Sequence, residues 1–174
     1  KKKPAEKPIT TARFRSASQI PDSHDLAHVY LPLSKYESIA DGVLLPPVIF
    51  DSELDAVKGR LETAVKKGAR HIMICNVGQL NIASEFGLIH GDHRFNVFNA
   101  FSAEFFASLG GLESLILSAE LTLPQIRDIY FDGSTLKGAI TYGRYPLMLL
   151  EKPVGKTSLR DTRGAVFPVL PEDS

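Results

Sequence analysis

The sequence predicts an α/β fold with a parallel sheet, on two observations. Apolar runs such as HIMIC (71–75) and LILS (115–118) are nearly continuous, which is typical of strands that are covered on both faces. Segments with helical periodicity or helix-start signals alternate with these runs along the chain. Alternation of strands and helices favours βα units, and therefore a parallel rather than an antiparallel sheet.

The number of strands limits the architecture. A closed barrel of eight βα units usually needs about 200 residues or more, whereas this chain has 174. We therefore predict a TIM-barrel-like domain over residues 9–174 with about seven βα units, in a contracted or incomplete barrel. An open doubly wound sheet is the alternative, but no strand is followed by a glycine-rich nucleotide-binding fingerprint. The predicted strands span residues 11–15, 28–33, 44–50, 71–76, 88–94, 114–118 and 137–144.

Three helices have clear signals. In 52–67, Leu54 and Leu61 belong to an apolar stripe at helical spacing, and a glycine follows the last turn. In 97–109, three phenylalanines, Phe98, Phe101 and Phe105, form one stripe that we assign to the core. A third, short helix begins after Thr122, with a proline in its first turn.

Composition excludes some classes of protein. Twenty basic residues balance twenty acidic ones, so charge does not indicate binding to RNA or to a membrane surface. No apolar run approaches the roughly 18 residues that a membrane span requires, and we expect a cytoplasmic protein. Residues 1–8, KKKPAEKP, are predicted to be a charged linker or tail, with a basic arm that touches RNA as the alternative. We expect other domains of a longer parent chain.

Five segments, in order, resemble the collagenase-like peptidases of family U32: GARHIMICNVGQL (68–80), HGDHRFNVFN (90–99), LSAELTLPQI (117–126), YGRYPLM (142–148) and DTRGAVFPV (161–169). The resemblance implies a barrel fold and peptidase activity on a peptide or protein substrate. Some relatives instead support hydroxylation of RNA or ubiquinone and hold an iron–sulfur cluster. Where those relatives carry cysteines after the closing strand, residues 144–153 have none, so we expect no iron–sulfur cluster here.

Ligands of such barrels bind at the carboxyl ends of the strands, where the βα loops converge. Arginines there can clamp an anion, asparagines can pair with amides, and carboxylates can act as acid or base. The strand-end side chains are Arg13, Arg15, Asp51, Asn76, Asp92, Arg94, Asn96, Glu120, Tyr142 and Arg144. From this region we predict that the ligand is contacted by Asn76, His90, Arg94, Asn96, Asn99, Tyr142 and Arg144.

Glu120 is the preferred acid–base residue because it follows the apolar run LILSA, where burial would raise its pKa. A helix cap or an ion pair with Arg144 is the structural alternative. Asp92 is the second catalytic candidate. His90 and Asp92 share a strand face, with His93 on the other, but two ligands do not make a metal site, and we predict no metal and no cofactor.

No nucleophile can be named. Cys75, the single cysteine, lies in an apolar run and is predicted to be buried and inert. Three functions therefore remain open: a collagenase-like peptidase domain, a non-catalytic accessory module of an RNA-modifying or hydroxylating protein, and a structural domain that completes a partner barrel.

Overall fold

The structure is a computed structural model that describes residues 8–131, 134–150, 152, 155 and 157–170. By its contacts the chain divides into two compact units, Lys1–Ile140 and Thr141–Ser174, which are described separately below. The single domain that the sequence predicts over residues 9–174 stays a prediction. The predicted linker or tail at residues 1–8 lies outside the described residues, apart from Pro8.

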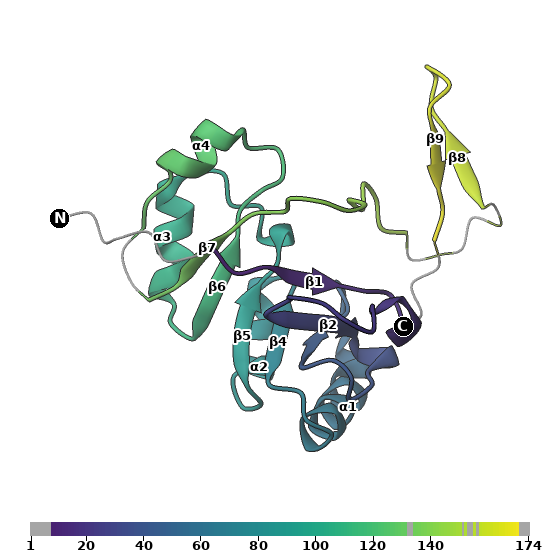
Figure 1. Ribbon diagram of the computed structural model, residues 1–174, viewed down its shortest axis with the longest axis vertical. Coiled ribbons are helices and arrows are strands. Elements are labelled where there is room, and N and C mark those ends of the chain that lie inside the picture. Colours follow the sequence, from purple (N-terminus) through teal and green to yellow (C-terminus); the bar gives the residue numbers. More distant parts are fainter. Residues whose placement is uncertain (1–7, 132–133, 151, 153–154, 156, 171–174) are drawn as a thin grey trace. The chain divides into compact units, whose positions relative to one another are not determined.

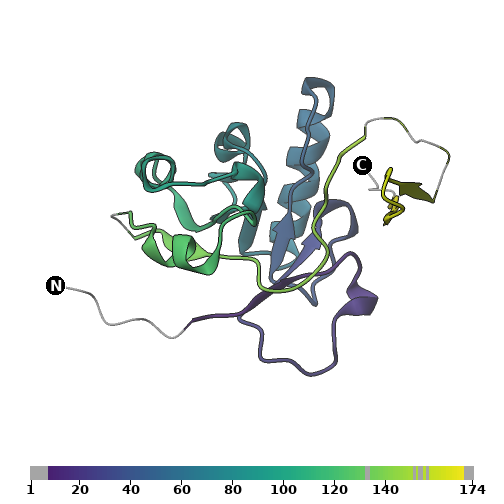
Figure 2. The ribbon, with the colours of Figure 1, turned by 90° about the horizontal axis from the view of Figure 1, so that it is seen from above.

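The first unit is built around a parallel sheet. Within the described residues the sheet has seven strands in the order of the sequence, so that each strand pairs with the next along the chain. The sheet curls into half of a barrel (Figure 2), which agrees with the predicted α/β class and with an incomplete barrel. The strands are β1 Thr11–Arg13, β2 His28–Pro32, β3 Gly42–Leu44, β4 His71–Ile74, β5 Leu88–Gly91, β6 Leu112–Ile116 and β7 Leu136–Gly138.

Helices connect the strands from β3 onward, whereas the first two connections hold only 3-10 turns (Figure 1). The contracted connections explain how so many strands fit into so short a chain. The α-helices are α1 Leu54–Lys66, α2 Leu80–Ala83, α3 Ala100–Ser108 and α4 Leu123–Asp128. The 3-10 helices are η1 Ala17–Gln19, η2 Leu33–Lys35, η3 Asp51–Glu53, η4 Val77–Gln79 and η5 His93–Phe95.

The two faces of the sheet differ in chemistry. On the outer, convex face, apolar strand residues such as Val43, Ile72 and Leu115 pack against helix residues such as Leu61 and Ala103 to form the main core. Because side chains alternate along a strand, the remaining positions point to the inner, concave face. Those positions are polar to an unusual degree, and they include His28, Tyr30, His71, His90 and Ser114.

Two strands differ from their predicted extent. The strand predicted at 44–50 instead lies at Gly42–Leu44, so only Leu44 is shared. It ends before Pro46 and Pro47, which have no N–H with which to continue a ladder. The run predicted at 137–144 pairs only at Leu136–Gly138.

The prediction that the phenylalanine stripe of α3 belongs to the core is wrong. The exposed fractions are 85% for Phe101, 56% for Phe105 and 38% for Phe98. The helix instead faces the sheet through the small side chain of Ala103, which is fully buried, and through Phe106, which packs against the core. Helical spacing alone did not reveal which face of α3 is covered.

The second unit contains an antiparallel hairpin of β8 Ser158–Arg160 and β9 Val166–Pro168. The Asp161 side chain stabilises its turn, because Oδ1 accepts hydrogen bonds from the backbone N–H groups of Arg163 (2.9 Å) and Ala165 (2.8 Å). Gly164, at φ +88°, supplies the left-handed conformation that the turn requires.

None of the helices formed by the described residues has the length and the apolar character that crossing a membrane would require.

Candidate functional site

A buried carboxylate, Asp92, organises the carboxyl ends of the strands. It directly follows β5, is 0% exposed, and caps the 3-10 helix η5 by accepting a hydrogen bond from the backbone N–H of Arg94 (3.1 Å). Its Oδ2 atom accepts hydrogen bonds from Arg13 Nη1 (2.8 Å) and from Arg94 Nη1 (2.9 Å). Its Oδ1 atom pairs with His93 Nδ1. We call Arg13, Asp92, His93 and Arg94 the Asp92 cluster.

The parallel sheet brings this cluster together. Arg13 is the last residue of β1, and Asp92 follows β5, 79 positions later. Their side chains meet because both lie at the carboxyl ends of strands of the same curled parallel sheet. The Arg13 and Arg94 side chains remain 28% and 18% exposed, so part of each side chain is reachable from solution.

The electrostatics of the cluster favour an anion. Burial raises the pKa of Asp92, but the hydrogen bond from His93 and the charges of Arg13, His93 and Arg94 outweigh this, and the pKa lies below its ordinary value. Asp92 is therefore a carboxylate at neutral pH. Two guanidinium groups face this one carboxylate, so the two arginines bring more positive charge than Asp92 neutralises.

Cys75 lies beside the cluster but is not poised as a nucleophile. It is 2% exposed, and its Sγ is 3.4 Å from the carbonyl oxygen of Leu45 and 3.6 Å from Arg94 Nη1. Burial first, and then the neighbouring charge of Asp92, raise the pKa of the Cys75 thiol to about 12. The prediction of a buried thiol is confirmed.

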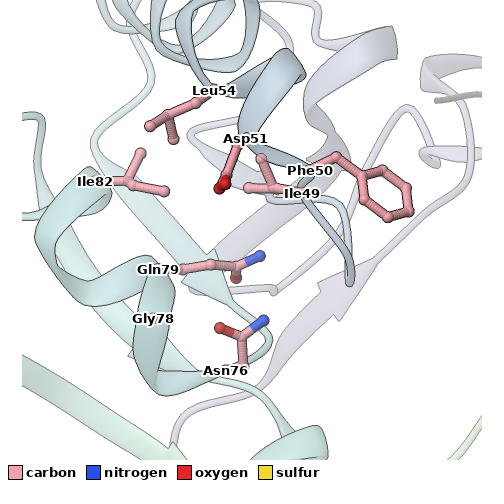
Figure 3. Close-up of a pocket in the computed structure, with 8 residues that line it drawn as sticks. All are labelled: Ile49, Phe50, Asp51, Leu54, Asn76, Gly78, Gln79 and Ile82. Atoms are coloured by element: carbon pink, nitrogen blue, oxygen red, sulfur yellow. The ribbon is translucent and has the colours of Figure 1, made fainter.

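A cavity of about 290 Å³ opens beside the ends of β3 and β4 (Figure 3). Asn76 and Asp51, both predicted strand-end residues, point into it from the loop after β4 and from the start of η3. Gln79 is held by the backbone: its Oε1 accepts from the Cys75 N–H (2.7 Å), and its Nε2 donates to the Pro46 carbonyl (2.7 Å). The cavity therefore has a fixed amide wall and an acidic rim.

The other predicted ligand contacts are spread over several places. His90 lies within β5 on the concave face, where its Nδ1 is 2.8 Å from Ser114 Oγ. Asn99 caps α3 by accepting from the Ser102 N–H (2.9 Å), and Asn96, at φ 54°, ends η5. Asn96 touches the Asp92 cluster through its backbone alone, where its N–H donates to the carbonyl oxygen of His93 (3.0 Å). Their roles in ligand binding stay predictions.

Three further candidates are Glu120, in the first unit, and Tyr142 and Arg144, in the second. Glu120 is exposed, outside the dry environment in which we expected it, and its backbone N–H donates to Ser118 Oγ (3.4 Å). Its role as acid or base stays a prediction. Tyr142 and Arg144 belong to the second unit, in a segment without helix or strand, and Tyr142 is 97% exposed.

Sequence reasoning placed His93 wrongly and missed a second polar group. His93 does not point away from Asp92, because β5 ends at Gly91 and the following 3-10 turn breaks the strand alternation. Among the described residues, His28, Asp41 and His71 also converge, each at the amino-terminal end of a strand. The sequence signal for these three is their common position at the starts of strands, whereas ligands of barrel folds are expected at the carboxyl ends.

The chain is similar to a curated protein that is described as a protease. The chain is 31% identical over 83 residues to the uncharacterized protease MJ0090 of Methanocaldococcus jannaschii. The matched segment makes up 47% of this chain and 20% of that protein. The chain thus spans about a fifth of the length of the relative it matches. No family model matches the chain. No solved structure gives a significant match.

Proposed function

We propose that this chain forms part of the α/β barrel of a collagenase-like peptidase of family U32, and that its Asp92 cluster binds a carboxylate group of a peptide substrate. The similarity to an archaeal protein described as a protease supports the first part. The half-barrel sheet, together with the ordered U32-like segments, supports it further. We place the protein in the cytoplasm.

The observation that carries the second part is the pairing of two arginines with one buried carboxylate. The Asp92 carboxylate accepts one hydrogen bond from Arg13 Nη1 and one from Arg94 Nη1. A guanidinium has five N–H donors. Arg13 also approaches Met73 Sδ (3.9 Å) and His93 Nδ1 (3.5 Å), and Arg94 Nη1 approaches Cys75 Sγ (3.6 Å). The Nε donor and at least one Nη2 donor of each arginine are left, among the contacts of the described residues, for a second, incoming anion. Because Asp92 fixes both groups in advance, a substrate carboxylate would find its clamp already ordered.

In this proposal Asp92 is a positioning residue. Its Oδ2 is occupied by two arginines and its Oδ1 by His93 and the Arg94 N–H, so it has no free oxygen with which to take a proton from a substrate. Glu120 remains the candidate acid or base, because its exposed carboxylate is free to approach a bound peptide.

A binding comparison tests the proposal. Two fluorescent peptides of identical sequence, one with a free terminal carboxylate and one with a terminal amide, are titrated with the chain, and anisotropy is measured. We expect the carboxylate form to bind about 10- to 100-fold more tightly, the value of one charged hydrogen-bonded contact. Arg94→Gln should remove this preference. Arg60→Gln, an exposed residue of α1, is the matched control. Equal binding of both peptides would contradict the proposal.

A structural role is the second candidate, and the open sheet favours it. Within the described sheet, β1 pairs only with β2 and β7 only with β6, so both edges can accept further strands. A second copy of the chain would close the barrel. Light scattering after size exclusion tests this: a dimer supports the structural role, whereas a monomer at high concentration contradicts it.

A further inference from the structure

A second polar group occupies the amino-terminal side of the concave face, apart from the Asp92 cluster. His28 begins β2, Asp41 directly precedes β3, and His71 begins β4, so three neighbouring strands each contribute one side chain. One nitrogen of each histidine and one oxygen of Asp41 lie within 4.8 Å of one another. We propose that these three residues bind one zinc ion.

The donor atoms suit zinc. Two imidazole nitrogens and one carboxylate oxygen are a mixed set that zinc accepts, whereas magnesium and calcium prefer oxygen ligands alone. Zinc–ligand bonds of about 2.0–2.2 Å put neighbouring ligand atoms of a tetrahedral site about 3.3 Å apart. Asp41 Oδ2 is 2.8 Å from His28 Nδ1 and 3.9 Å from His71 Nε2. Side-chain shifts of about half an ångström would therefore bring both pairs to the tetrahedral value.

The backbone already fixes these three residues relative to one another. The Asp41 carbonyl accepts hydrogen bonds from the N–H groups of Arg70 (2.8 Å) and His71 (3.1 Å). The Asp41 carboxylate is anchored as well, because its Oδ1 accepts from the Val29 N–H (2.7 Å). Oδ2 is hydrogen bonded to His28 Nδ1 (2.8 Å), and the ion would take the place of the proton between these two atoms. The site is thus tied to the sheet through three strands, and it does not depend on a mobile loop.

A hydrogen-bonded chain behind His71 sets the direction of its free nitrogen. His71 Nδ1 is 2.9 Å from His90 Nε2, and His90 Nδ1 is 2.8 Å from Ser114 Oγ. When each imidazole donates along this chain, His71 Nε2 keeps its lone pair and faces Asp41 Oδ2 at 3.9 Å. Two lone pairs then face each other without a proton between them, and a cation satisfies both. Such a partner behind a histidine is the usual support of a metal ligand.

Solution can reach the site. The side chains of His28, Asp41 and His71 are 23%, 41% and 14% exposed, so zinc has a route of entry and its remaining coordination positions are open to water. Three protein ligands plus water is the arrangement of zinc sites that do chemistry, whereas structural sites are closed by four protein ligands. The proposal does not depend on carboxylate binding at the Asp92 cluster.

The test is zinc binding by the tag-free chain after treatment with EDTA and desalting. Calorimetry should show one zinc ion per chain with micromolar or tighter affinity. His71→Ala and Asp41→Asn should each weaken binding by at least about tenfold, and His90→Asn by about tenfold through loss of support for His71. Asp41→Asn keeps an acceptor for the Val29 N–H, so the strand start is preserved. His24→Ala, a change of an exposed histidine, is the control and should bind as the wild type does.

Cobalt gives a second readout that does not rely on the variants. Bound to the wild-type chain, Co²⁺ should show the visible absorption of a tetrahedral site with nitrogen and oxygen ligands, and zinc should displace it. Circular dichroism shows which variants fold. The proposal is overturned if the folded wild-type chain binds no zinc, if folded Asp41→Asn and His71→Ala bind it as tightly as the wild type, or if His24→Ala loses it.

Discussion

Arg13 and Asp92 are 79 positions apart in the chain, and their side chains are joined by a 2.8 Å hydrogen bond between Nη1 and Oδ2. This ion pair connects the first strand of the sheet to the end of the fifth. One partner, Asp92, is completely buried, whereas the Arg13 side chain is 28% exposed. The pair therefore contributes to both the stability of the half-barrel and the order of the proposed binding site.

Removal of the buried carboxylate should destabilise the chain. Asp92→Ala leaves Arg13 and Arg94 facing each other without a counter-charge. We expect a loss of about 3 kcal/mol in the free energy of unfolding, at the lower end for a broken buried pair because both arginines are partly exposed. Urea unfolding measures it. Asp25→Ala, at an exposed aspartate, should change stability little. Equal stabilities of the two variants would show that the pair is not structural.

The lowered pKa of Asp92 predicts a pH dependence of stability. A carboxyl group whose folded pKa is depressed contributes stability above its unfolded pKa of about 4, and loses it as pH falls toward the folded pKa. Urea unfolding of the wild type and of Asp92→Asn between neutral pH and pH 3 should therefore show a difference that shrinks below about pH 4. A difference that is constant over this range would mean that Asp92 is not depressed in the folded state.

The close approach of Tyr30 to Gly42 predicts that alanine substitutions at Gly42 and Gly59 have opposite effects on stability. The two residues are register partners on β2 and β3, and a Cβ on Gly42 would lie 2.5 Å from the buried Tyr30 ring. Gly42→Ala should therefore destabilise the chain by about 2 kcal/mol. Gly59→Ala, in α1 with no neighbour within 4 Å of the added Cβ, should stabilise it by up to about 1 kcal/mol. Thermal unfolding of both variants checks the two signs.

Peptide turnover tests the acid–base assignment. If the chain hydrolyses a peptide, Glu120→Gln should lower kcat by about 100-fold or more, the usual contribution of general acid–base catalysis, without changing the fold. Glu62→Gln, at an exposed position of α1, is the matched control. Unchanged turnover in Glu120→Gln would remove this residue from the mechanism.

Sequence patterns predicted the sheet better than the site. The buried strands β4, β5 and β6 followed from apolar runs because burial on the convex face selects those residues, whereas β3 and β7 were predicted with the wrong extent. The exposure of Phe101 could not be predicted, because a helical stripe does not show whether another element covers it. Asp92 and Arg94 could be singled out as strand-end residues, but the meeting of His28, Asp41 and His71 depends on strand register, which a single sequence does not contain.

The most direct measurement of the proposed function is a titration of the chain with the carboxylate peptide, followed by NMR of the arginine side-chain N–H signals. We expect saturable shifts of the Arg13 and Arg94 signals at the same peptide concentration, with the Arg60 signals unchanged and with no shift on addition of the amide peptide. Shifts confined to other arginines, or equal shifts with both peptides, would contradict carboxylate binding at the Asp92 cluster.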